Sequence, residues 1–207
     1  MFPIMVDLSD KKIVVAGGGH VAYHKIQHLL KYHVHVYVVS PTFHHRIVEL
    51  ANEKKVTLIQ KSIEYEDYKD AFFVIAATNS KIVNDQIANS AKPHQLVVNT
   101  TDPQKGNCTI PASFNRGKLV IGVSTGGASP TLAKQIKNQI AEQYDERYES
   151  YLEFLFEIRE TIKQHISDPQ EKRKWLKKAV DPIYLSSTKE QQRFREQLES
   201  VWNHDLL

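Results

Sequence analysis

The chain has 207 residues and a formal net charge of +3, and Cys108 is its single cysteine. The length suits one or two domains, and so small a charge gives no argument for a nucleic-acid partner. No run of residues reaches the roughly 18 apolar positions of a membrane-spanning helix, and residues 1–7 lack the basic start of a signal peptide. A lone cysteine excludes an internal disulfide and fits a reducing compartment. We therefore expect a cytoplasmic protein without a nucleic-acid or membrane partner.

The first motif is a glycine turn between a predicted strand over residues 12–16 and a predicted helix over residues 20–32. It matches the pattern G-x-G-x-x-A. Gly17 permits the tight turn, Gly19 lets the backbone approach a pyrophosphate, and Ala22 is small enough for the helix to pack against the strand. The unpaired N–H groups at the helix start favour phosphate. The motif predicts a dinucleotide site, with a glycine-rich turn that binds no ligand as the alternative.

Strands and helices alternate up to about residue 100. The pattern predicts further strands over residues 33–39, 56–59, 72–76 and 96–99, and helices that Thr42 and Ser80 cap and that end near residues 52 and 91. Such alternation is typical of a Rossmann-type α/β domain with a doubly wound parallel sheet. The strand ends then share one edge, where a ligand should lie. The expected cofactor contacts at this edge also include Ser40, Pro41, Thr42, Thr78, Asn79 and Asn99.

The end of the second predicted strand lacks the acidic residue that commonly binds the adenine ribose. Ser40 stands there, so backbone groups or the Thr42 hydroxyl would have to bind the ribose. His44, His45 and Arg46 follow closely and could meet a 2′-phosphate. Spacing alone therefore leaves NADP open beside NAD.

Asp102 is the candidate catalytic residue. It stands just beyond the fifth predicted strand, at the edge where a nicotinamide would project. A carboxylate there could take a proton while a hydride leaves for the cofactor. The alternative is a plain turn residue, because Asp-Pro is a common turn pair.

The pattern changes after residue 102. A predicted strand over residues 119–124 leads into a second glycine turn at Gly126 and Gly127, and Ser129 and Pro130 then cap and open a helix to about residue 144. This turn is either an anion site or a plain loop with a good cap. The middle third of the chain is also basic, which either attracts an anionic small molecule or keeps the surface solvated. The basic residues are Lys105, Arg116, Lys118, Lys134 and Lys137.

From residue 145 onward the pattern predicts helices only. Phe194, Leu198 and Trp202 form an apolar stripe at helical spacing, as expected for packing. The ten histidines include close pairs, but no cysteine or carboxylate completes a ligand set at standard spacing. We therefore expect no metal site.

Taken together, these motifs resemble the precorrin-2 dehydrogenase family, which includes the N-terminal module of siroheme synthases and stand-alone bacterial forms. The resemblance spans about the first two thirds of the chain in the family's order, with a helical tail of the family's size after it. The matching segments are Phe2-Pro3-Ile4, residues 14–22 followed by Lys25, Ser40-Pro41, residues 76–79, residues 98–102 and residues 123–130.

The resemblance implies oxidation of the tetrapyrrole precorrin-2 to sirohydrochlorin, with NAD bound at His20, Val21, Pro41 and Thr42, and Asp102 as the catalytic residue. It implies a homodimer in which the region after the sheet domain is exchanged between protomers. The substrate carries several carboxylates, which would give the basic residues a purpose. The expected substrate contacts are Ser124, Gly126, Gly127, Lys105, Arg116 and Lys134.

Two alternatives stay open. Some family members also insert iron into sirohydrochlorin through the same aspartate. A non-catalytic NAD-sensing module whose helical tail binds a partner or nucleic acid would explain the Rossmann half and the helices, but it gives Asp102 and the second glycine turn no role. Thr125 stands where some relatives have a second serine, so no role that rests on that serine is carried over. We expect three parts: an NAD-binding Rossmann domain over residues 1–113, a dimerisation segment over residues 114–145 and a small all-helical domain over residues 146–207.

Overall fold

The computed structural model describes the backbone of residues 1–203 and the side chains of residues 1–201. The chain divides into two compact units, Met1–Ile110 and Pro111–Leu207, and each is described by itself. The finer division into three parts stays a prediction. None of the described helices is both long and apolar enough to cross a membrane.

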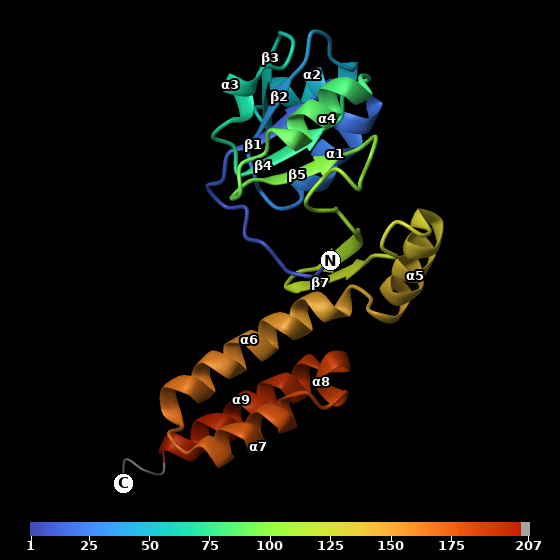
Figure 1. Ribbon diagram of the computed structural model, residues 1–207. Coiled ribbons are helices and arrows are strands. Elements are labelled where there is room, and N and C mark those ends of the chain that lie inside the picture. Colours follow the sequence, from blue (N-terminus) through green and yellow to red (C-terminus); the bar gives the residue numbers. More distant parts are fainter. Residues whose placement is uncertain (204–207) are drawn as a thin grey trace. The chain divides into compact units, whose positions relative to one another are not determined.

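The first unit is built on a five-stranded parallel sheet with the strand order β3-β2-β1-β4-β5 (Figure 1). Its strands are β1 (Ile13–Ala16), β2 (Val36–Val39), β3 (Val56–Ile59), β4 (Phe73–Ala76) and β5 (Leu96–Asn99). The register is flush, because Ala16, the last residue of β1, lies beside Val39 and Ala76, the last residues of its two neighbours. The carboxyl ends of the strands therefore form one level edge. The chain winds outward from β1 to β3 and then returns to β4, so the topological switch lies between β1 and β4.

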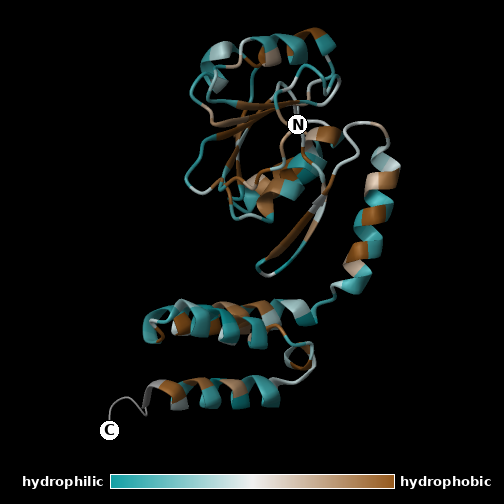
Figure 2. Cartoon of the chain, turned by 60° about the horizontal axis from the view of Figure 1, so that its bottom comes forward, coloured by the Kyte–Doolittle hydropathy of each residue, from teal (hydrophilic) through white to brown (hydrophobic). Residues whose placement is uncertain are grey.

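Helices cover both faces of this sheet, as the predicted doubly wound fold requires. Alternate residues of a strand point to opposite faces, so Val15 packs with the helices α1 (His20–Leu30) and α2 (His45–Asn52) in one core. Val14 packs in a second core with α3 (Tyr65–Tyr68) and α4 (Lys81–Asn89). Figure 2 shows the apolar residues concentrated along the strands, between helices that carry both hydrophilic and hydrophobic residues.

Several local predictions needed correction. Thr42 does not cap α2; the cap is His44, whose Nδ1 accepts a hydrogen bond from the Arg46 N–H at 3.3 Å. The reason is that the backbone from Ser40 to His44 first crosses the glycine turn, where the His44 N–H donates to the Gly18 carbonyl at 2.7 Å. The second strand begins at Val36 rather than at residue 33, because His33 adopts a positive φ of 55°, which is not an extended conformation.

Two short elements escaped the sequence pattern, namely α3 and the strand β6 (Ala112–Arg116). Helix α3 is a single turn held by a capping box between Glu64 and Asp67, which is too short to show a period. The predicted caps Ser80 and Ser129 are confirmed, since their side chains accept from the N–H groups of Val83 and Leu132.

The outer edge of β5 is covered by the chain that follows it. The Val97 N–H donates to Oδ1 of Asn107 at 2.7 Å, and the Val97 carbonyl accepts from the N–H groups of Asn107 at 3.1 Å and Cys108 at 3.4 Å. Gly106 makes this close approach possible, because a Cβ there would lie 2.7 Å from the Val97 carbonyl oxygen.

The second unit starts with an antiparallel hairpin and continues as helices. Strand β6 pairs with β7 (Leu119–Val123). The helices that follow are α5 (Pro130–Gln143), α6 (Arg147–His165), α7 (Pro169–Ala179), α8 (Ile183–Ser186) and α9 (Thr188–Asn203). Phe154 of α6 packs with Tyr184 and with Phe194 and Leu198 of α9 in a separate core. The predicted all-helical tail and the burial of Phe194 and Leu198 are confirmed, while the side chain of Trp202 lies outside the described residues.

Candidate dinucleotide site

The turn after β1 has two glycines with opposite surroundings. Gly17 has a φ of +117°, and a Cβ there would lie 2.3 Å from the Ala77 carbonyl oxygen at the end of β4. Only glycine fits where β1 and β4 end together. Gly19, by contrast, has nothing within 4 Å of the position that a Cβ would occupy. Its missing side chain therefore leaves open space rather than relieving a clash.

The open space lies at the start of α1. Gly19 is the N-cap of this helix, and no side chain caps its first turn. His20 and Val21 are exposed there, while Ala22 is fully buried against the sheet. A helix N-terminus with exposed backbone N–H groups attracts phosphate. This arrangement fits the pyrophosphate of a dinucleotide.

The loop after β2 is packed over the same turn. A Cβ on Gly18 would lie 2.1 Å from the Thr42 carbonyl oxygen and 2.9 Å from Oγ of Ser40, which is buried. The Pro41 carbonyl accepts from Nε2 of Gln60 at 3.3 Å, which holds the loop in place. Ser40, Pro41 and Thr42 are thus brought to the glycine turn, at the place where an adenine ribose would lie.

Three histidine rings lie close together at the starts of α1 and α2. The ring of His44 lies 5.8 Å from that of His20 and 4.3 Å from that of His45, centroid to centroid. Partial burial lowers the pKa of His44, and its electrostatic interactions with His45, His20 and Arg46 lower it further. The Arg46 guanidinium beside these imidazoles favours an anionic group.

At the end of β4, Thr78 is held by a buried amide. Oδ1 of Asn84 accepts from the N–H of Thr78 at 3.0 Å and from its hydroxyl at 2.7 Å, and Nδ2 of Asn84 donates to the Thr78 carbonyl at 3.0 Å. Asn79 follows with an exposed side chain. These contacts fix the chain at the edge between β4 and α4.

At the end of β5, the buried side chain of Asn99 organises the next turn. Its Oδ1 accepts from the backbone N–H groups of Thr101 and Asp102, both at 3.0 Å, and from the Thr101 hydroxyl at 2.8 Å. Its Nδ2 donates to Oδ1 of Asp85 at 3.0 Å. Asn99 therefore positions Asp102; its predicted contact with the cofactor stays a prediction.

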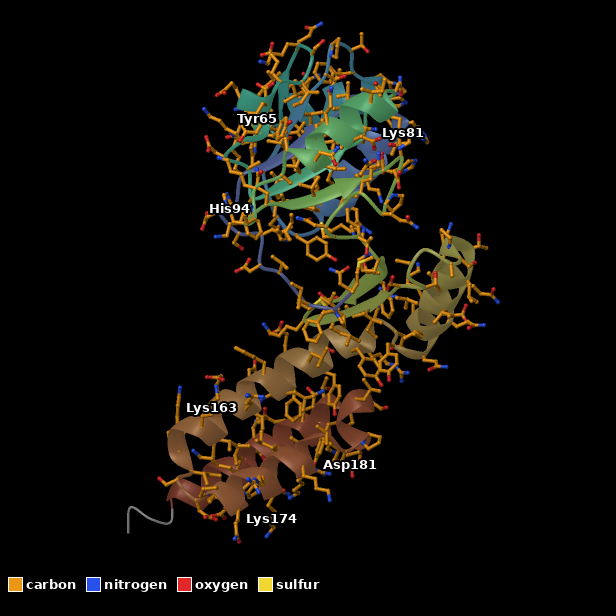
Figure 3. All side chains as sticks on the ribbon, in the orientation of Figure 1. Tyr65, Lys81, His94, Lys163, Lys174 and Asp181 are labelled. Carbon is orange, nitrogen blue, oxygen red and sulfur yellow. The ribbon has the colours of Figure 1, made fainter. Side chains whose placement is uncertain are left out.

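Asp102 lies within a group of charged side chains at this edge. Nζ of Lys81 lies 3.1 Å from Oδ2 of Asp102 and 3.0 Å from Oδ2 of Asp85. Nζ of Lys105 lies 2.6 Å from the same oxygen of Asp85. Lys81 follows β4 and His94 precedes β5, and Figure 3 shows these two side chains at opposite ends of the sheet.

The predicted substrate contacts after residue 110 lie in the second unit. Oγ of Ser124 accepts from the Gly126 N–H at 3.2 Å, and Gly126 and Gly127 adopt φ values of +62° and +91° with open space around them. The Arg116 guanidinium packs over the Phe114 ring. Lys134 is exposed on α5.

Three residues of α4 at this edge belong to no motif in the sequence, namely Lys81, Asn84 and Asp85. Lys81 and Asp85 are four residues apart, a spacing that is typical of an ordinary solvated ion pair on a helix. Asn84 is a single polar residue in a helix, and no local pattern shows that it is buried. Only the sheet topology shows that these side chains meet the turn after β5.

Two other features lie away from this edge. A hollow of about 740 Å³ between α1, the end of α2 and the residues before β2 is lined by basic side chains, among them His28, Lys31, His35 and Lys54. It does not include the glycine turn. Within the described residues, no group of three or more His, Cys, Asp or Glu side chains is arranged to hold a metal ion.

The level sheet edge, the glycine turn and the uncapped helix define a Rossmann-type NAD(P)-binding protein. Residues 4–112 match a family model described as putative NAD(P)-binding, residues 116–143 match the central part of sirohaem biosynthesis proteins, and residues 148–194 match the SirC C-terminal domain. The chain belongs to the precorrin-2 dehydrogenase family.

Individual relatives agree with this assignment. The chain is 35% identical to a precorrin-2 dehydrogenase of Priestia megaterium over 199 residues, which cover 96% of this chain and 98% of that one. It is 39% identical to a precorrin-2 dehydrogenase of Bacillus subtilis over 136 residues, which cover 66% and 84%. A solved structure of SirC, a precorrin-2 dehydrogenase, matches with a TM-score of 0.81 and 34% identity over 97% of this chain and 100% of that chain.

Proposed function

We propose that this protein oxidises precorrin-2 to sirohydrochlorin with a nicotinamide dinucleotide as the oxidant. Membership of the precorrin-2 dehydrogenase family supports the reaction. The observation that carries the proposal is the open, uncapped start of α1 beside Gly19, at the same sheet edge as Asp102. Neither feature alone requires an oxidoreductase, but together they supply a place for the phosphates and a proton acceptor.

The reaction removes two hydrogens from the macrocycle, one with the bonding electron pair and one without it. A nicotinamide dinucleotide held at Gly19 and the start of α1 would supply the hydride acceptor. The Asp102 carboxylate takes the proton and passes it to water, to which its side chain is 30% exposed. Asn99 and Lys81 hold Asp102 from its backbone and its side chain during this transfer.

We propose NAD as the cofactor, following the family resemblance. Nothing acidic stands at the end of β2 to repel a 2′-phosphate, and His44, His45 and Arg46 lie close by. NADP should therefore bind with an affinity within about tenfold of that for NAD, since no buried like charge penalises it. Titration of each dinucleotide against the protein measures this ratio.

The substrate carboxylates belong to the same proposal. Lys105 and the second-unit residues Ser124, Gly126, Gly127, Arg116 and Lys134 are the proposed contacts. We also propose a cytoplasmic homodimer joined through residues 114–145, with no nucleic-acid or membrane partner. Sedimentation equilibrium of the whole chain tests the dimer.

A Gly19→Ala variant tests the dinucleotide site. Because nothing lies within 4 Å of the new methyl group and Gly19 has an ordinary φ of −88°, the fold should keep its melting temperature. The methyl group would fill the space that the pyrophosphate needs, so the Kd for NAD should rise at least about tenfold. Wild-type affinity in this variant would contradict the proposed site.

An Asp102→Ala variant tests the chemistry separately. It should bind NAD like the wild type but form NADH from precorrin-2 about 100-fold more slowly or worse, the usual contribution of a general base. Wild-type turnover would remove Asp102 from the reaction.

A further inference from the structure

In the charged group around Asp102, the side chains differ in how many hydrogen bonds hold them in place. Asp85 is its most firmly held member, because Lys105, Lys81 and Asn99 all donate to its carboxylate, at 2.6, 3.0 and 3.0 Å. These hydrogen bonds, the one from Lys105 first, lower the pKa of Asp85 to about 2. The Asp85 side chain is only 16% exposed. Asp85 is therefore a fixed negative charge throughout the neutral pH range.

Lys81 lies between this fixed charge and Asp102. Its ammonium group donates to Oδ2 of Asp85 at 3.0 Å and to Oδ2 of Asp102 at 3.1 Å. The hydrogen bonds to the two carboxylates raise the pKa of Lys81, so that it stays a cation. A charge-assisted hydrogen bond at this distance limits the rotation of the Asp102 carboxylate.

We propose that Lys81 is a positioning residue for Asp102, and that Asp85 holds Lys81 in place for this task. The inference rests on the proposed function, because it concerns the carboxylate that takes the substrate proton. Before the reaction, the two negative charges of Asp85 and Asp102 balance the two positive charges of Lys81 and Lys105. After Asp102 accepts its proton, Lys81 keeps its hydrogen bond to Asp85, so the geometry survives until the proton leaves to water.

A lysine elsewhere in the same unit provides a matched comparison. Nζ of Lys61 also bridges two carboxylates, those of Glu64 at 2.7 Å and Asp67 at 3.0 Å, beside α3. In each bridge a partly exposed lysine joins one largely buried carboxylate, Asp85 or Asp67, to a more exposed one, so loss of either lysine should affect stability to a similar degree. A difference in turnover between variants of the two lysines therefore reports on the reaction rather than on folding.

The first experiment compares Lys81→Met, Lys81→Arg and the control Lys61→Met in the full-length protein with NAD and precorrin-2. We expect kcat of Lys81→Met to fall roughly 10- to 100-fold, the range for groups that orient a functional side chain, while the Kd for NAD stays unchanged. Lys81→Arg keeps the cation and should recover most of the turnover. Lys61→Met should match the wild type.

The second experiment shows whether Lys81 acts through Asp102. In an Asp102→Asn background, where no carboxylate is left to position, Lys81→Met should cause no further loss of kcat, so that the effects of the two substitutions are not additive. Full additivity of the two losses would overturn the proposal. Wild-type kcat in Lys81→Met would also overturn it, as would an equal loss in Lys61→Met.

An Asp85→Asn variant tests whether Asp85 holds Lys81 in place. The amide keeps the size of the side chain but removes the charge that holds Lys81, so kcat should fall by at least about threefold without a change in the Kd for NAD. An unchanged kcat would limit the inference to Lys81 and overturn the role of Asp85. These outcomes differ from failure of the proposed function, in which the wild-type protein itself forms no NADH from precorrin-2.

Discussion

At the scale of single residues, Asp85 should link the stability of the first unit to pH. Its folded pKa of about 2 lies below the ordinary value of 3.8, so its stabilising contribution is complete above about pH 4 and disappears as the pH falls towards 2. Asp85→Asn lacks this contribution, so its urea midpoint should be lower than that of the wild type at pH 7 and should converge on it at pH 2. Urea titrations followed by circular dichroism check this.

The control for this prediction is Asp70→Asn, which changes a carboxylate that is 66% exposed and 3.5 Å from Lys92. It should keep the wild-type difference in midpoint between pH 7 and pH 2. If Asp85→Asn and the wild type differed by the same amount at both pH values, the carboxylate charge would not be the cause.

Some residues of the site can be predicted from the sequence and others cannot. Gly17, Gly19 and Asp102 could be selected because each stands at a fixed offset from a predicted strand. Lys81 and Asp85 could not, since their importance comes from contacts with Asn99, Asp102 and Lys105, which lie 14 to 21 residues further along the chain. Contacts between the ends of neighbouring strands depend on strand order, and local spacing does not encode that order.

At the scale of elements, Gly17→Ala should destabilise the first unit by at least about 2 kcal/mol. The new methyl group would lie 2.3 Å from the Ala77 carbonyl oxygen, at a φ that side chains rarely adopt, and both effects cost free energy. Urea unfolding of the two glycine variants measures the difference, with Gly19→Ala as the control that should change stability by less than about 1 kcal/mol. Equal losses in both variants would contradict this account of the turn.

Element boundaries show why some predictions succeeded. Caps at Ser80 and Ser129 are local events between a hydroxyl and an N–H three residues later, so the sequence around them suffices. The predicted start of α2 was wrong because the backbone before the helix packs across Gly18, a residue more than twenty positions earlier. Strand β6 was not predicted because its pairing with β7, rather than an alternating pattern of its own, defines it.

At the scale of the whole molecule, the two units have separate cores and separate spectroscopic reporters. Phe194 is 1% exposed and packs against Phe154, Trp175 and Tyr184. Phe194→Ala should therefore destabilise the second unit by about 3–5 kcal/mol. Both tryptophans lie in that unit, so their fluorescence should report its unfolding at a lower urea concentration than in the wild type.

Cys108 reports on the first unit in the same samples. Burial raises the pKa of its thiol to about 11, so alkylation should be slow until the first unit unfolds. We expect Phe194→Ala to leave the urea dependence of alkylation unchanged. The control Phe156→Ala removes a half-exposed ring of α6, and it should change the free energy of unfolding from either signal by less than about 1 kcal/mol. A common shift of both signals in Phe194→Ala would mean that the units unfold together.

The chain segment along β5 has a consequence for how copies of this protein can associate. A free sheet border offers unpaired peptide groups to any strand that arrives, and this is a common beginning of aggregation. Here Asn107 and Cys108 already occupy the peptide groups of Val97. A second copy therefore cannot extend the sheet at β5 by pairing with Val97 unless this segment first moves away.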